Sequence, residues 1–249
     1  MALDRTLPPL SPAAIAALKD DLRAARGVLT SSDPAWDPHG LALAELTFHE
    51  VSVTGDATPL TIAQTFVDIV LARHGQTGPL AAGAHLAQAR FQWINAKLRG
   101  ASDAALSTAQ ETVDTGLAAP ATDPLTTAEL YLMAARILID RAGLADALAV
   151  QFDLTHRAGA AIDAAAALCP PSDAPGLAAA IHEAHAHIGT QIAYHLSDNA
   201  ARAERLGEVA EDARTARDLF APHLPDRAAS LEALIASTER LRAAIRDSR

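Results

Sequence analysis

The sequence predicts an all-α protein built of stacked antiparallel helical hairpins, and three observations support this. Alanine, the best helix-forming residue, is abundant along the chain. Apolar residues recur at spacings of three and four, which is the period of an amphipathic helix. No stretch of useful length alternates polar and apolar residues as a strand does, and the four residues VSVT at 51–54 come nearest.

The first helix is expected to begin after Ser11, because Ser-Pro has the form of an N-cap followed by proline in the first turn. Its apolar residues follow at helical spacing: Ile15, Leu18, Leu22, Ala25 and Leu29. The next stretch, SSDPAWDPHG at 31–40, contains two Asp-Pro steps, and proline disfavours helix in the residue before it. This stretch therefore predicts a linker, with Trp36 pinning it to the body of the protein.

Nine further helices are expected from the periodicity, at about 40–54, 59–74, 80–99, 102–117, 125–142, 145–168, 175–197, 200–221 and 226–247. Gly55, Gly75 and Gly100 stand where left-handed C-terminal caps are expected. The sequence TTAE at 126–129 has the spacing of a capping box.

Alternate helices start at about 40, 80, 125 and 175, which gives a period of roughly 40 to 50 residues, as in helical-hairpin repeats. The predicted domains are an N-terminal helix with a Pro-rich linker at 1–39, a helical-hairpin repeat domain at 40–225 and a C-terminal capping helix at 226–249. Each hairpin must stack on its neighbours to bury its apolar face.

One stretch, AELYLMAARILIDRAGLADALA at 128–149, places Tyr131, Ala135 and Leu138 on one helix and Leu144 and Ala147 at the start of the next. This pattern of large and small packing positions resembles one repeat of a tetratricopeptide-repeat protein or a similar α-solenoid. The family's Trp and Leu-Gly signature is absent. The resemblance implies a superhelical scaffold whose first helices line a concave surface for a protein partner, and it implies no catalytic residues.

Composition excludes several classes of function. A formal net charge of −10 argues against a nucleic-acid partner, since phosphate binding requires clustered Lys and Arg. No apolar run has the length of a signal peptide or a membrane span, so we expect a soluble, cytoplasmic chain without a membrane partner. The single cysteine, Cys169, precludes a disulfide within the chain and is expected to be an inert apolar filler.

Motifs for nucleotide and acyl chemistry are missing. Neither GxxxxGK[ST] nor GxGxxG occurs, and GxSxG is absent too. The sequence therefore assigns no catalytic residue and no cofactor.

The stretch HEAHAHIGTQIAYH at 182–195 holds four of the ten histidines and raises the question of a metal site. At 100° per residue, and relative to the apolar stripe of this helix, His195 lies near the stripe centre, while His185 and His187 fall at about +80° and −80°. His182 points outward at about +140° and Glu183 at about −120°. The four histidines therefore do not converge on one site.

Two pairs have the spacing of ligands on one helix face: His182 with His185, and Glu183 with His187. We expect Glu183 and His187 to form an exposed i, i+4 pair, His195 to be a hydrogen-bonded interior histidine, and the other two to be surface residues. No metal site is assigned. The speculative candidates for one are His187, Glu183 and His195.

Two functions remain open at this point. The preferred one is a non-enzymatic scaffold or adaptor, monomeric or homodimeric, that binds a peptide or helix of another protein. The acidic charge of the chain would suit a partner with basic residues. The alternative is a helical-bundle protein or enzyme in which His195, His85 and Tyr194 line a pocket for a metal or small molecule.

Overall fold

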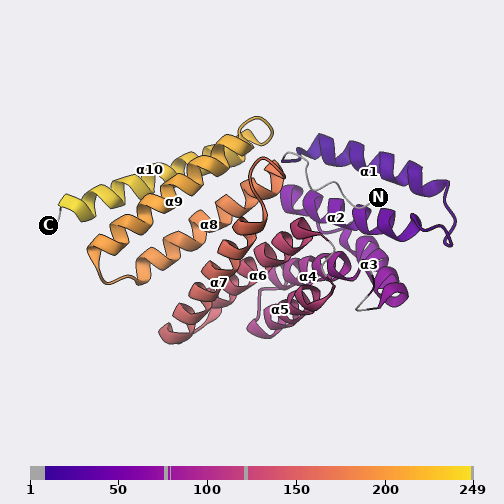
Figure 1. Ribbon diagram of the computed structural model, residues 1–249, viewed down its shortest axis with the longest axis horizontal. Coiled ribbons are helices and arrows are strands. Elements are labelled where there is room, and N and C mark those ends of the chain that lie inside the picture. Colours follow the sequence, from indigo (N-terminus) through magenta and orange to yellow (C-terminus); the bar gives the residue numbers. More distant parts are fainter. Residues whose placement is uncertain (1–8, 76–77, 79, 121–122, 248–249) are drawn as a thin grey trace. The chain divides into compact units, whose positions relative to one another are not determined.

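The computed structural model describes residues 9–75, 78, 80–120 and 123–247. The leading segment 1–8, on which part of the signal-peptide prediction depends, lies outside these residues. The described part of the chain forms helices α1 to α10 and contains no strand (Figure 1). The prediction of an all-α protein is confirmed.

Beyond Pro9 the chain divides into two compact units, Leu10–Met133 and Ala134–Arg249, and the boundary falls within α6. Helices that lie wholly in the first unit are α1 (Pro12–Gly27), α2 (Trp36–Thr54), α3 (Leu60–His74), α4 (Ala81–Leu98) and α5 (Asp103–Ala118). The boundary helix is α6 (Pro124–Leu144). Helices of the second unit are α7 (Leu148–Leu168), α8 (Pro175–His195), α9 (Asn199–Phe220) and α10 (Pro225–Asp247).

The largest error in the predicted boundaries concerns the linker at 31–40, because α2 begins at Trp36. The Asp33 carboxylate accepts the backbone N–H of Ala35 at 2.9 Å, which prepares the start of the helix. Pro38 then falls in the first turn, where a missing N–H costs no intrahelical bond. Trp36 is thus part of a helix rather than of a loop.

Local cap signals were mostly correct. The Ser11 hydroxyl accepts the Ala14 N–H at 3.3 Å, as an N-cap does. The three glycines predicted to end helices have positive φ angles: 74° at Gly55, 61° at Gly75 and 86° at Gly100.

The predicted capping box at 126–129 is wrong. The Asp123 carboxylate accepts the N–H groups of Leu125 and Thr126 at 3.1 and 3.2 Å and therefore caps α6. Glu129 instead bonds Arg90 of α4 at 2.6 Å. Side-chain contact between helices outweighs the local capping pattern here.

Helices that are adjacent in sequence pack against each other within each unit: α1 to α5 in the first and α7 to α10 in the second. In the first unit α2 also contacts α4. Aromatic and aliphatic side chains such as Phe48, Val67 and Phe91 form the core there. In the second unit small residues and a few larger ones, including Ala213, Phe220 and Ile235, fill the space between α8, α9 and α10.

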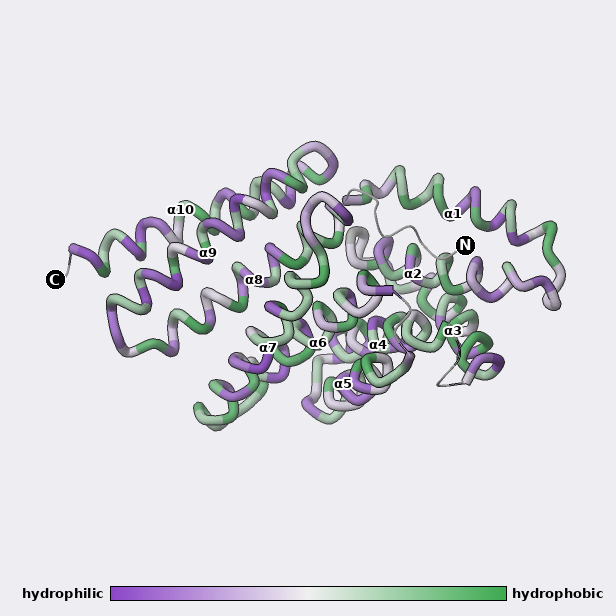
Figure 2. Tube along the Cα trace, in the orientation of Figure 1, coloured by the Kyte–Doolittle hydropathy of each residue, from purple (hydrophilic) through white to green (hydrophobic). Residues whose placement is uncertain are grey.

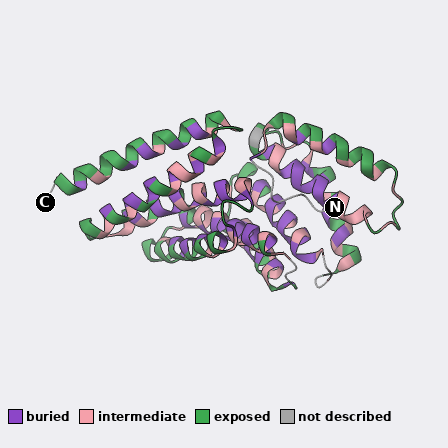
Figure 3. Cartoon of the chain, turned by 45° about the horizontal axis from the view of Figure 1, so that its top comes forward, coloured by how far each residue is buried: buried purple, intermediate pink, exposed green. Residues whose placement is uncertain are grey.

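The last two helices are the most hydrophilic, as the purple stretches of Figure 2 show. Exposed residues predominate along α10 (Figure 3), and its buried positions are spaced at helical intervals: Ala228, Leu231, Ile235, Thr238 and Ile245. Within the described residues, no helix has an apolar stretch long enough to cross a membrane.

Candidate functional site

Glu183 and His187, the first two candidate metal ligands, do not form the expected pair. Glu183 accepts two hydrogen bonds from the Arg227 guanidinium of α10, one of them from Nε at 2.8 Å. His187 is exposed. The prediction of an exposed Glu183–His187 pair is wrong because Arg227 of α10 reaches Glu183, and a guanidinium binds a carboxylate through two parallel hydrogen bonds.

His195, the third candidate, is half-buried, and its Nδ1 is buried without a hydrogen-bond partner among the described residues. Its ring packs against Phe152 of α7 at a centroid distance of 5.5 Å. The expectation of a hydrogen-bonded interior histidine is therefore wrong, since an aromatic ring occupies the neighbouring position. Within the described residues no group of three His, Cys, Asp or Glu side chains could hold a metal ion.

The other two histidines of α8 are joined through a carboxylate that the sequence did not indicate. His182 Nδ1 lies 2.8 Å from Asp212 Oδ1, and His185 Nδ1 lies 2.5 Å from Asp212 Oδ2. His185 Nε2 lies 2.9 Å from Asp163 of α7. These four side chains tie together α7, α8 and α9, so His182 and His185 are not simple surface residues.

The charge states in this network follow from its hydrogen bonds. Both ring nitrogens of His185 face carboxylates, which only accept, so both must carry protons and the ring is a cation. The bond to Asp212 raises the pKa of His185, against the opposing effect of burial. Burial raises the pKa of Asp212, but the hydrogen bonds and charges of His182 and His185 outweigh it and bring that pKa to about 2.

Exposed apolar side chains of α7 and α8 gather near His195: the Phe152 ring lies between those of His156 and His195, Leu148 lies one turn before Phe152 on α7, and Tyr194 precedes His195 on α8. We call this group of side chains the α7–α8 surface. Leu148 is 77% exposed and Tyr194 62%. The rings of Phe152 and His156 lie 4.2 Å apart between centroids. Of the nine large apolar side chains exposed in the described part of the chain, five are Tyr194 or fall within residues 144–152.

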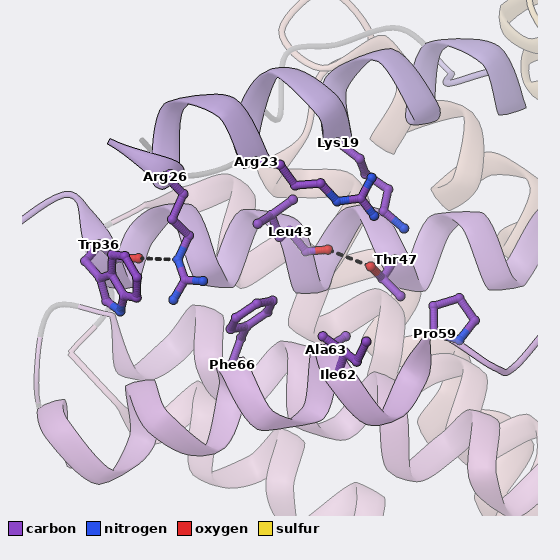
Figure 4. A pocket seen from close by; sticks show the side chains of 11 residues that line it. Lys19, Arg23, Arg26, Trp36, Leu43, Thr47, Pro59, Ile62, Ala63 and Phe66 are labelled. Atoms are coloured by element: carbon purple, nitrogen blue, oxygen red, sulfur yellow. Dashed lines mark hydrogen bonds between the residues drawn. The ribbon is translucent and has the colours of Figure 1, made fainter. Parts of the chain in front are cut away.

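A second candidate site is a cavity of about 320 Å³ in the first unit, lined by residues of α1, α2 and α3 (Figure 4). Its cationic residues all come from α1: Lys19, Arg23 and Arg26. Opposite them lie apolar side chains such as Leu43, Ala63 and Phe66. Sequence analysis missed this site, although the spacing of four and three places the cations on one face of α1.

The interior of the first unit also contains polar groups. Arg90 and Glu129 form a buried ion pair, and the Arg90 guanidinium lies 5.0 Å from the centre of the Phe48 ring. Neither ring nitrogen of His85 has a hydrogen-bond partner among the described residues. Burial lowers the pKa of His85 and so favours the neutral ring.

Comparison of the chain with protein-family models, with curated proteins and with solved structures gives no match. The α7–α8 surface and the cavity between α1, α2 and α3 are therefore the two features from which a function can be proposed.

Proposed function

We propose that this chain is a non-enzymatic interaction protein, a helical-repeat scaffold in which a peptide or helix of another protein is bound. The observation that carries this proposal is the α7–α8 surface. Leu148, Phe152 and Tyr194 expose apolar area to water, which is unfavourable, and gathered exposed apolar side chains favour a contact site for another protein. Aromatic side chains are also enriched among the residues that dominate binding energy.

The arrangement of the helices supports a repeat scaffold. Sequential helices pack as neighbours from α1 to α5 and from α7 to α10, and the contact between α2 and α4 is the kind expected between first helices of successive hairpins. In a helical-repeat scaffold, residues 128–149 would form one repeat of a tetratricopeptide-like solenoid.

The charge around the surface indicates what the partner carries. Exposed Asp146 precedes Leu148 along the chain, and exposed Asp153, which lies 3.7 Å from Arg157, follows Phe152. Together with the net charge of −10, they suit an apolar helix or peptide bordered by basic residues, whose approach the acidic chain accelerates.

The test is affinity capture from the cells that make the protein, with the tagged full chain as bait. A Leu148→Ser, Phe152→Ser double variant removes apolar area from the surface, and Val28→Ser removes an 85% exposed side chain elsewhere as the matched control. We expect one or a few polypeptides to be captured by the wild type and by Val28→Ser, and to be lost at least tenfold with the double variant. Equal capture by all three folded proteins would contradict the proposal.

A small-molecule-binding protein is the second candidate, and the observation that favours it is the cavity between α1, α2 and α3; His85, Tyr194 and His195, named above for such a pocket, do not line this cavity. Its volume of about 320 Å³ lies at the lower end of the range for ligand sites, roughly 300 to 1,000 Å³. Titration calorimetry with the probes described below tests this alternative independently of any protein partner.

A further inference from the structure

The cavity between α1, α2 and α3 has a lining of one charge sign. Lys19, Arg23 and Arg26 contribute to it, and no Asp or Glu is among the described lining residues. This is notable in a chain whose acidic residues outnumber Lys and Arg by 30 to 20. A concave wall of cations favours an anion inside it.

Two of the three cations already have carboxylate partners. Lys19, which is buried, bonds Glu50 of α2, and exposed Arg23 bonds Asp20 at 2.9 Å. Arg26 differs: its one hydrogen bond among the described residues joins Nε to the Trp36 carbonyl at 3.4 Å. The cavity therefore has one guanidinium whose terminal nitrogens are open to a ligand.

The Arg26 guanidinium is held in place by two rings. Its central carbon lies 3.8 Å from the centre of the Trp36 ring and 4.4 Å from that of Phe66. Figure 4 shows Arg26 reaching from α1 toward these rings. Stacking uses the faces of the planar group and leaves its edge, with both Nη atoms, for hydrogen bonds.

The nearest other carboxylate does not occupy that edge. Asp37 bonds Arg73 at 3.0 Å and His74 at 3.0 Å. Burial lowers the pKa of Arg26, whereas the charge of Asp37 raises it and that of Arg73 lowers it. A guanidinium that is partly desolvated and lacks a direct carboxylate partner gains most from an incoming anion.

The rest of the lining is mostly apolar, and its one hydroxyl, that of Thr47, donates to the Leu43 carbonyl at 2.8 Å. Leu43 and Ala63 are buried at the base, while Ile62 is 67% exposed. A ligand that fits must therefore combine one negative charge with a hydrocarbon body. Carboxylate matches guanidinium through two parallel hydrogen bonds, and one open Arg balances one negative charge better than a phosphate dianion.

We propose that the α1–α3 cavity binds a small organic carboxylate, with the charged group on the Nη edge of Arg26 and the apolar body against Leu43, Ile62 and Phe66. This site is separate from the α7–α8 surface, and the inference does not depend on the proposed function. Ile62, which is 67% exposed, lies where the lining meets solvent.

The experiment is isothermal titration calorimetry of the full chain with 4-phenylbutyrate and with its neutral counterpart, 4-phenylbutan-1-ol. We expect the acid to bind with a Kd of about 1 mM or tighter and at least tenfold more tightly than the alcohol. Arg26→Gln should weaken binding of the acid at least tenfold. Arg99→Gln, which removes the same charge from an exposed position on the same unit, should leave it unchanged.

A second variant keeps the test valid if Arg26→Gln does not fold. Ile62→Asp changes a mostly exposed helical residue and places a carboxylate at the cavity, where it should compete with the acid and weaken binding at least tenfold. Equal affinity for acid and alcohol, or unchanged binding in both folded variants, would overturn the proposal. A hexaglutamate peptide tests the other source of carboxylates, an acidic protein segment. If that peptide bound in an Arg26-dependent way and 4-phenylbutyrate did not bind, the proposal of a small-molecule site would also be overturned.

Discussion

Asp212 on α9 accepts a 2.5 Å hydrogen bond from Nδ1 of His185 on α8. The same ring bonds Asp163 of α7 through Nε2, so one protonated imidazole links three helices of the second unit. The positive charge of Arg205 opposes protonation of His185, and His182 also bonds Asp212. Stability of this unit must therefore depend on the protonation of both Asp212 and His185.

The first prediction concerns pH. Asp212 has a lowered pKa of about 2, so its contribution is present above the unfolded value of about 3.9 and is lost as pH falls toward 2. His185 has a raised pKa, so its contribution is present below the unfolded value of about 6.5 and is lost as pH rises through the folded value. The network therefore stabilises most between about pH 4 and 6.5.

Urea unfolding at a series of pH values measures this effect. Asp212→Asn should lower the free energy of unfolding near pH 5 by about 1 to 2 kcal/mol, after allowing for solvent screening of these partly exposed groups. The difference between variant and wild type should shrink at both ends of the range. A constant difference from pH 2 to 8 would show that the network does not titrate as the geometry requires. Asp163→Asn, which alters a mostly exposed partner, provides the matched control with a smaller effect.

The second prediction concerns the buried pair of Arg90 and Glu129, whose side chains are 7% and 10% exposed. Glu129→Leu should destabilise by about 3 to 5 kcal/mol because it leaves the Arg90 charge buried without this carboxylate. Arg90→Met combined with Glu129→Leu should recover most of the loss, since an apolar pair needs no compensation. Thermal and urea unfolding would report both variants.

An exposed ion pair in the second unit provides the control for these two variants. Arg157 and Asp153 lie 3.7 Å apart with both side chains more than half exposed. Asp153→Ala should change stability by less than about 0.5 kcal/mol. If Glu129→Leu cost no more than Asp153→Ala, the Arg90–Glu129 pair would have no role in the stability of the interior.

Sequence patterns predicted the features that depend on neighbouring residues. Ser11-Pro12 and Gly55 mark helix ends through contacts within a few residues, so they could be identified without a structure. The direction of His185, on the flank of the α8 stripe, was also calculable. What occupies that flank was not, because Asp212 is 27 residues away and reaches it only through the packing of α9 on α8.

The α1–α3 cavity could not be predicted for the same reason. The spacing of Lys19, Arg23 and Arg26 was readable, but solvated charge on one face of a helix is the ordinary case. Only the approach of Trp36 and Phe66 turns Arg26 into a stacked, partly buried cation. The contact of Trp36 with Arg26 was not predicted, because the predicted linker at 31–40 placed Trp36 in a loop rather than at the start of α2.

The third prediction follows from the failed capping box. Asp123→Ala should destabilise by about 1 kcal/mol, because the first N–H groups of α6 lose their acceptor. Asp123→Asn should retain most of the stability, as Asn is a comparable N-cap. Chemical denaturation would distinguish the two. An equal loss in both variants would mean that the charge, rather than the cap, is what matters at this position.

The last prediction concerns the close approach of α8 and α9. A Cβ at Gly189 would lie 2.8 Å from Cγ2 of Val209, a buried and stiff side chain. Gly189→Ala should therefore lower the free energy of unfolding. Overpacking of the α8–α9 contact costs about 1 to 3 kcal/mol, whereas the better helix propensity of Ala contributes only about 1 kcal/mol in the opposite direction. Combining it with Val209→Ala should relieve the clash, so the double variant should lose less than the sum of the two single changes.

Gly143 of α6 provides the matched control for Gly189, because a Cβ there would meet nothing within 4 Å. Gly143→Ala should be neutral or stabilise by up to about 1 kcal/mol through helix propensity alone. Opposite signs for the same substitution, measured by urea unfolding under one condition, would separate helix packing from helix propensity. Stabilisation by Gly189→Ala equal to that by Gly143→Ala would instead mean that α8 and α9 lie farther apart than the structure places them.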